Sequence, residues 1–251
     1  MIDLSGKRAL VTGGSRGIGA ATSRLLAQCG AHVAVSYRTR SAAAEAMAAE
    51  LRSFGVRSFA QAAELSDRRA VDGLFNRTER EFGGLDIFVG NAGIWPVEEA
   101  AVNAMEDEQW RRTMAENVDG MFYTTRGALR CLGAGGRVVL VASTAGQRGE
   151  AMHADYAASK GAMISFVKSI AIEVALQDIT VNCVAPGWVD TDMCAEVFEQ
   201  GGRERIARSI PVGRIATPGD IAAPIVFLCS AQARHITGEV LNVNGGSVLC
   251  G

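Results

Sequence analysis

The chain has 251 residues, 48% of them hydrophobic and 21% charged, with a formal net charge of −2. This length and composition predict a single large globular domain, and the absence of a basic block argues against a nucleic-acid partner. No apolar run is long enough to predict a membrane span, and MIDLSGKRAL at the N-terminus lacks the layout of a signal peptide. We therefore expect cytoplasmic residence.

Apolar runs alternate with helical patterns along the whole chain. The runs that predict strands are 7–12, 32–37, 56–60, 85–90, 136–143, 179–186 and 239–244. The patterns that predict helices are 17–30, 41–55, 67–82, 107–132, 154–176 and 218–230. This alternation predicts one α/β domain over 1–251, a Rossmann-type doubly wound parallel sheet of about seven strands with helices on both faces. Ligands of such sheets bind at the carboxyl ends of the strands.

The six cysteines and three histidines are scattered, and none has the spacing of a metal site. We expect free thiols in a reducing compartment and no bound metal.

A glycine-rich turn, TGGSRGIG, joins the first predicted strand to the first predicted helix. Gly13 suits the tight turn, Gly17 a close approach of backbone to a pyrophosphate, and Gly19 the packing of helix on sheet. The helix N-terminus favours an anion. Although GxxxGxG alone is also compatible with a purely structural turn, its position between strand and helix predicts a dinucleotide site that also includes Ser15 and Ile18.

Basic residues follow the second predicted strand, which ends at Tyr37 and Arg38. An NAD site usually has an acidic residue there for the ribose, whereas a 2′-phosphate calls for arginine. No acidic residue occurs between Leu4 and Ala44, and Arg16, Arg38 and Arg40 are the available cations. Arginine binds phosphate through two parallel hydrogen bonds. The pattern favours NADP (NADPH) over NAD, with solvated loop charges as the alternative.

Three further residues have the chemistry of a carbonyl reductase. Ser143 ends a predicted strand, and Tyr156 and Lys160 of YAASK share one face of a predicted helix. A nearby ammonium and an oxidised nicotinamide would both lower the pKa of a tyrosine from its usual value of about 10. Tyr156 could then exchange a proton with a substrate oxygen that the Ser143 hydroxyl holds.

In these motifs the chain resembles the short-chain dehydrogenase/reductase family over essentially its whole length. TGGSRGIG, GNAG at 90–93, ENVDG around Asn117, Ser143, YAASK and VAPGWVDTDM at 184–193 occur in the family's order. Within the family, the chain looks most like 3-oxoacyl-carrier-protein reductases and related ketoreductases. The resemblance implies a homotetramer and a catalytic set of Asn117, Ser143, Tyr156 and Lys160, with the main chain of Asn117 holding a water in a proton relay.

The resemblance also implies further cofactor contacts. Lys160 would bond the nicotinamide ribose, and Tyr156 would lie beside the ring. The adenosine side would be lined by Glu64, Leu65, Asn91, Ala92 and Gly93, and the nicotinamide by Pro186, Gly187, Val189 and Thr191. Three positions depart from the family pattern, namely Glu64 for Asp, Gly90 for Asn and Asn244 for Asp.

The substrate is a small-molecule carbonyl or acyl compound. Trp95, His153 and Trp188 are candidate substrate contacts, and a mobile lid is expected near 191–210. Ile172 stands where carrier-protein reductases often have arginine. This difference weakens the hypothesis that the substrate is attached to a carrier protein.

Three functions remain open from the sequence. The leading hypothesis is NADPH-dependent reduction of a ketone or 3-oxoacyl group by hydride transfer, with tyrosine as the general acid. A second is an NAD-dependent secondary-alcohol dehydrogenase, and a third is a catalytically silent dinucleotide-binding regulator.

Overall fold

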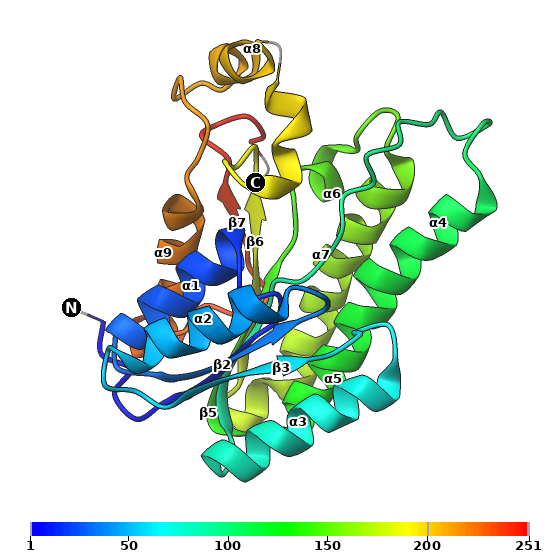
Figure 1. The fold of residues 1–251 in the computed structure, drawn as a ribbon. Coiled ribbons are helices and arrows are strands. Elements are labelled where there is room, and N and C mark those ends of the chain that lie inside the picture. Colours follow the sequence, from blue (N-terminus) through cyan, green and yellow to red (C-terminus); the bar gives the residue numbers. More distant parts are fainter. Residues whose placement is uncertain (1, 200, 250–251) are drawn as a thin grey trace.

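A computed structural model describes residues 2–199 and 201–249, and these form a central sheet between two layers of helices (Figure 1). The strands are β1 (Arg8–Val11), β2 (His32–Tyr37), β3 (Ser58–Ala62), β4 (Leu85–Gly90), β5 (Leu132–Val141), β6 (Thr180–Pro186) and β7 (Val240–Val243). They are all parallel, in the order β3-β2-β1-β4-β5-β6-β7. The predicted seven-stranded, doubly wound sheet is confirmed.

Helices connect the strands in the described part of the chain. They are α1 (Gly17–Gln28), α2 (Ser41–Arg52), α3 (Arg68–Phe82), α4 (Asp107–Met114), α5 (Gly120–Cys131), α6 (Ala145–Arg148), α7 (Ala154–Val174), α8 (Gly202–Ser209) and α9 (Pro218–Leu228). The patterns predicted every long helix, but β3 lies two residues beyond its predicted range. The helix predicted over 107–132 is interrupted by a π-helical turn, Ala115–Asp119.

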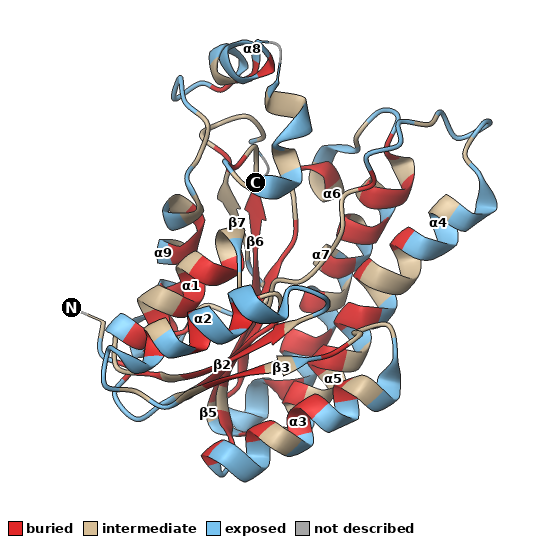
Figure 2. Cartoon of the chain, viewed as in Figure 1, coloured by how far each residue is buried: buried red, intermediate tan, exposed pale blue. Residues whose placement is uncertain are grey.

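Side chains alternate across the strands to form two apolar cores. On one face, Val33 and Val35 pack in the core that α1, α2 and α9 cover. On the other face, Leu10 and Ala34 pack in the core that α3, α5 and α7 cover. The central strands are buried on both faces, as parallel sheets require, whereas the edge strand β7 is only partly buried (Figure 2). The α7 sequence is correspondingly rich in apolar residues.

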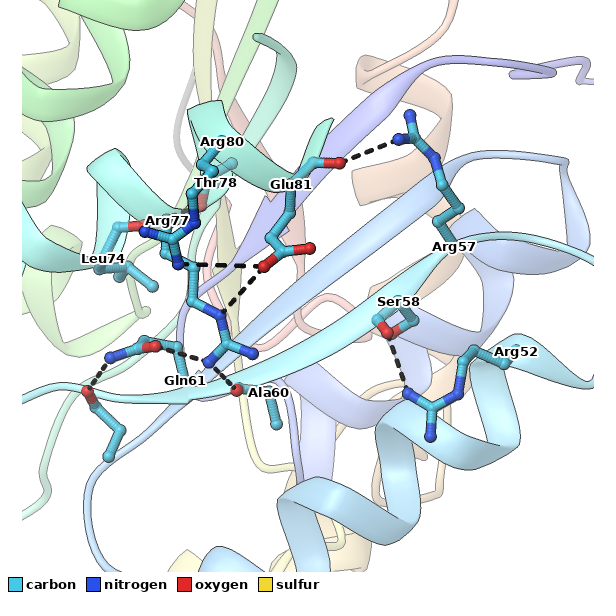
Figure 3. A network of polar contacts seen from close by, with 11 residues as sticks. Arg52, Arg57, Ser58, Ala60, Gln61, Leu74, Arg77, Thr78, Arg80 and Glu81 are labelled. Atoms are coloured by element: carbon cyan, nitrogen blue, oxygen red, sulfur yellow. Dashed lines mark hydrogen bonds and ion pairs between the residues drawn. The ribbon is translucent and has the colours of Figure 1, made fainter. Parts of the chain in front are cut away.

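Arginines cover the open edge of the sheet at β3 (Figure 3). Arg52 donates a 2.9 Å hydrogen bond to the Ser58 carbonyl, and Arg77 donates bonds of 2.9 Å to the Ala60 carbonyl and 2.7 Å to the Gln61 side chain. Successive carbonyls along a strand point to opposite sides. The Arg57 carbonyl accepts a backbone hydrogen bond from β2, so the Ser58 and Ala60 carbonyls point away from β2. These side chains occupy acceptors that would otherwise attract another strand.

The strand order reverses between β1 and β4, where chain connections leave in opposite directions. A crevice forms at such a switch point, beyond the carboxyl ends of the strands. A cleft does open there, and its lining includes residues that follow β1, β2, β4, β5 and β6.

Candidate active site

The glycine turn after β1 has the shape that a pyrophosphate requires. Gly13 and Gly17 have φ angles of 62° and 51°, which favour glycine. A Cβ on Gly19 would lie 2.2 Å from the Gly13 carbonyl oxygen, so the turn and α1 pack too closely for any side chain. Helix α1 has no side-chain N-cap and no acidic residue in its first turn. Its N-terminal amides therefore remain available to an anion, and the turn fits a dinucleotide.

Thr12 and Asn91 join this turn to the end of β4. The Thr12 hydroxyl accepts hydrogen bonds from the backbone amides of Asn91 (2.9 Å) and Ala92 (3.0 Å). The Asn91 side chain donates in return to the Thr12 carbonyl at 2.9 Å. The sequence motif placed Asn91 at the cofactor but did not reveal Thr12, whose position at the strand end was the available signal.

Carboxylates from distant segments meet Arg16 and Arg38, which were predicted as cofactor contacts, and Arg40, the third available cation. Arg38 pairs with Glu116, 78 residues away. Arg40 lies 2.9 Å and Arg16 lies 3.7 Å from the same carboxylate, that of Asp192. All five residues line the cleft. The structure thus places the three arginines at the cleft and partly offsets their charge with two acids that local sequence did not reveal.

Burial shifts the pKa of Glu116. Removal from water raises the pKa of its carboxyl, an effect that the Arg38 guanidinium opposes and that the nearby Glu64 carboxylate reinforces. The part of the cleft that Arg38, Glu64 and Glu116 line therefore carries charges of both signs.

Ser143, Tyr156 and Lys160 meet where β5 ends against α7. Ser143 follows β5, whereas Tyr156 and Lys160 lie one turn apart near the start of α7. The Ser143 side chain acts on the phenol, because it lowers the pKa of Tyr156. The Lys160 ammonium lies 5.7 Å from the centre of the Tyr156 ring and donates a 2.8 Å bond to the Val141 carbonyl. All three line the cleft.

Burial dominates the pKa values of this group. It raises the pKa of Tyr156 to about 12, although the Ser143 side chain lowers it. Burial also lowers the pKa of Lys160 to about 8. The expected lowering of the tyrosine pKa is therefore not found in the chain alone, because desolvation of the phenolate dominates and the Lys160 ammonium is not among the groups that shift this pKa. At neutral pH the phenol keeps its proton and the lysine keeps its charge.

Asn117 lies behind this group, within the π-helical turn. Its side chain accepts a 2.8 Å bond from the Ile94 amide and donates bonds of 3.0 Å to the Ile94 carbonyl and 3.1 Å to the Ser159 hydroxyl. Asn117 is only 2% exposed and does not line the cleft. Such π-helical turns are frequent at functional sites. Here the turn fixes Asn117 between the β4 loop and α7.

The other predicted site residues fall into two groups, those that line the cleft and those that do not. Most line the cleft: Gly13, Ser15, Gly17, Ile18, Tyr37, Glu64, Leu65, Asn91, Ala92, Gly93, Trp95, Pro186, Gly187, Trp188, Val189 and Thr191. Gly19 lies beneath the turn. His153, predicted as a substrate contact, is 5% exposed and outside the cleft lining, and its ring lies against that of Trp95 with centres 4.1 Å apart and an interplanar angle of 44°.

The expected lid region, 191–210, consists of two short 3-10 turns and α8, and residue 200 within it lies outside the described residues. Its residues Asp192, Met193 and Cys194 line the cleft.

In the described chain, no group of three or more His, Cys, Asp or Glu side chains could hold a metal ion. Its five cysteines are free, and Cys250 is outside the described residues. No described helix has the length and hydrophobicity to cross a bilayer.

The doubly wound sheet, with its glycine turn at the switch point, defines a Rossmann-type protein. Residues 13–247 match a family described as Enoyl-(Acyl carrier protein) reductase. A 3-oxoacyl-[acyl-carrier-protein] reductase of Vibrio cholerae is 38% identical over 247 residues, 98% of each chain. A versicolorin reductase of Emericella nidulans is 39% identical over 97% of this chain and 96% of its own length.

A solved structure of a short chain dehydrogenase from Burkholderia cenocepacia, in complex with NADP, superposes with a TM-score of 0.91. It is 36% identical, and the alignment covers 97% of this chain and 98% of that one. The chain belongs to the short-chain dehydrogenase/reductase family.

Proposed function

We propose that this protein reduces a ketone or 3-oxoacyl group to a secondary alcohol with NADPH. The carrying observation is the convergence of Ser143, Tyr156 and Lys160 in the same cleft as the glycine turn. Relatives named as 3-oxoacyl-[acyl-carrier-protein] and versicolorin reductases support the reaction class. NADPH supplies the hydride when bound.

Residues of the chain supply and stabilise the transfer of the proton that the carbonyl oxygen receives. Tyr156 donates its phenolic proton to the carbonyl oxygen as that oxygen gains negative charge. The Ser143 hydroxyl donates a hydrogen bond to the same oxygen and orients it. The Lys160 ammonium stabilises the phenolate that remains, and the fixed position of Asn117 suits a main-chain contact to a relay water.

The glycine turn would hold the pyrophosphate, and Arg16, Arg38 and Arg40 would face the adenosine ribose. Their fork geometry suits a 2′-phosphate. An NADP complex of a relative supports this preference. Steady-state rates with NADPH and NADH test it directly. Arg38→Asp should move the preference towards NADH. Arg69→Asp, which reverses the charge at an exposed position of α3, should leave the preference unchanged.

An NAD-dependent alcohol dehydrogenase is the second candidate, because Glu116 and Asp192 bring carboxylates to the same arginines. A carboxylate can accept a hydrogen bond from a ribose hydroxyl. A large preference for NADH in the native protein, unchanged in Arg38→Asp, would establish this candidate and overturn the NADPH proposal.

We also propose that the protein is a homotetramer. The support is an aromatic surface shared by α5 and α7. Phe122 on α5 is 40% exposed, and its ring lies 6.4 Å from that of Phe166 on α7. Exposed apolar groups of this kind favour association.

A further inference from the structure

A chain of aromatic rings runs from the predicted proton donor to the expected lid. The ring of Trp95 lies 4.1 Å from that of His153, 4.7 Å from Tyr156 and 6.3 Å from Trp188. Trp188 in turn lies 6.1 Å from Phe198. We call these five residues the ring cluster. Its members come from the loop after β4, the start of α7, the loop after β6 and a 3-10 turn of the lid region.

The ring cluster forms the wall beside the reacting oxygen. Trp95, Tyr156 and Trp188 line the cleft, whereas His153 is buried behind Trp95. Trp95 meets Tyr156 at an interplanar angle of 73°. A carbonyl bound to the Tyr156 hydroxyl therefore presents its substituents to the two indole rings. Because His153 packs against Trp95, that wall is supported from behind.

Two ion pairs border the ring cluster, and the Lys160 ammonium lies 5.7 Å from the centre of its Tyr156 ring. Arg148 lies 3.2 Å from Glu150, and both line the cleft. Arg203 lies over the ring of Phe198 at 4.9 Å and pairs with Asp190 at 2.6 Å. Around the two indole rings the wall is thus aromatic, and the Arg148–Glu150 and Arg203–Asp190 pairs beside it each carry no net charge, which suits an uncharged planar group more than an anionic one.

We propose that the preferred substrate is a planar ketone whose carbonyl is fused to or conjugated with an aromatic ring. This inference rests on the proposed reductase function and names its substrate class. Aromatic rings interact favourably at centroid separations of about 4.5–7 Å, in stacked or edge-to-face geometry. A planar ring system also loses less rotational freedom on binding than a flexible acyl chain.

Two bicyclic ketones test the proposal, because 1-tetralone and 1-decalone share a carbon skeleton and a carbonyl position but only the first has an aromatic ring. The measurement is the ratio of their kcat/KM values with NADPH in the native protein and in Trp95→Leu and Trp188→Leu. Comparing variants cancels the difference in intrinsic reactivity. We expect the tetralone-to-decalone ratio to fall about three- to tenfold in each variant.

The chain has a third tryptophan for the control. Trp110 on α4 is 43% exposed and outside the cleft lining, so Trp110→Leu should leave the ratio unchanged. Trp95→Phe, which keeps a ring, should retain most of the ratio and guards against a folding defect. Equal losses for both ketones in the two leucine variants would overturn the aromatic preference.

A binding measurement separates this inference from the proposed reaction. Calorimetric titration of the NADPH-loaded protein with 1-naphthol and with decahydro-1-naphthol needs no turnover. We expect 1-naphthol to bind at least about threefold more tightly. Equal affinities would refute the ring preference, whereas failure to oxidise NADPH with any of the two bicyclic ketones and an acetoacetyl thioester would refute the reductase function.

Discussion

Tyr156 and Lys160 have opposite pKa shifts with one physical cause. Burial penalises charge, so it raises the pKa of the phenol to about 12 and lowers that of the ammonium to about 8. At neutral pH this leaves a proton on Tyr156 and a positive charge beside it. That combination suits a residue that gives a proton to a carbonyl oxygen and is then stabilised as an anion.

Tyr156→Phe removes the donated proton while keeping the ring that packs against Trp95. We expect kcat for ketone reduction to fall by about 10²–10⁴-fold, because this is the usual contribution of a positioned general acid. Titration of NADPH fluorescence should show cofactor affinity within about twofold of native, since a phenyl ring conserves the packing. Retention of native kcat would contradict the assignment.

The rate of ketone reduction should fall as pH rises through about 8, where Lys160 loses its proton. Without the ammonium, the phenolate left by Tyr156 is less stable, and log kcat/KM should decline by about one per pH unit. The folded pKa of Lys160 lies below its ordinary value of 10.5, so the unfolded chain binds the extra proton between these values. This group therefore adds stability as pH rises across that window.

The measurement is a pH profile of kcat/KM between pH 6 and 10, with circular dichroism at each pH to confirm that the fold persists. A profile that stays flat to pH 10 would exclude Lys160 as the titrating group.

At the scale of elements, Asp192 connects the lid region to two separate strand–helix turns. Its carboxylate faces Arg16 before α1 and Arg40 before α2. All three side chains are about half exposed, so the pairs contribute little to stability. Their consequence is for binding, because a cofactor phosphate must compete with this carboxylate for both guanidinium groups.

Asp192→Asn removes that competition. We expect the Kd for NADPH to decrease about two- to fivefold, because exposed ion pairs of this kind are worth up to about 1 kcal/mol. The Kd for NADH, which lacks the 2′-phosphate, should change less. Glu196→Gln is the matched control, since it removes a carboxylate from the same region outside the cleft lining. Equal shifts for both cofactors would count against a phosphate site at these arginines.

Helix α9 begins with a reciprocal cap. The Thr217 side chain accepts from the Asp220 amide at 3.2 Å, and the Asp220 carboxylate accepts from the Thr217 amide at 2.7 Å. The Arg214 guanidinium, and then the hydrogen bonds that the Thr217 amide and hydroxyl donate to the carboxylate, hold the pKa of Asp220 well below its usual range. The stabilisation is therefore complete above the ordinary aspartate pKa and is lost as pH falls through the lower, folded-state value.

Thr217→Ala removes one half of this cap. We expect the free energy of unfolding to fall by about 1 kcal/mol, as measured by urea denaturation at neutral pH. Thr217→Ser keeps the hydroxyl and should lose much less. An unchanged denaturation midpoint in the alanine variant would show that the cap contributes nothing.

At the scale of the whole molecule, helices α5 and α7 leave aromatic side chains exposed on their outer surface. Phe122 and Phe166 lie on α5 and α7, and the Arg126 guanidinium stacks over Phe122 at 4.8 Å. A second copy of the chain presenting the same helices would bury these groups, as a two-fold interface does.

Phe122→Glu should break the assembly, because it places a charge in the proposed interface. Light scattering after size exclusion should show tetramers for the native protein and a smaller species for the variant. Phe54→Glu is the control, since Phe54 is also 40% exposed but follows α2. A native protein that runs as a monomer would overturn the proposal.

Local patterns were enough to predict the fold. The alternation of apolar runs with helical patterns predicted seven parallel strands with helices on both faces, because periodicity is a property of neighbouring residues. The predictions were wrong in detail where tertiary packing intervenes. The π-helical turn at Ala115–Asp119 belongs to a segment with an unbroken helical pattern, and β3 lies two residues later than its apolar run suggested.

The sequence by itself determined the sheet, the glycine turn and the residue types available for hydride and proton chemistry. Each of these follows from residues that are close together along the chain. Only the tertiary structure decided the electrostatics around them. Glu116 and Asp192 reach arginines 78 and 152 residues away, and burial, not the neighbouring Lys160, controls the pKa of Tyr156. Charge interactions and desolvation depend on distance in space, which spacing along a chain does not reveal.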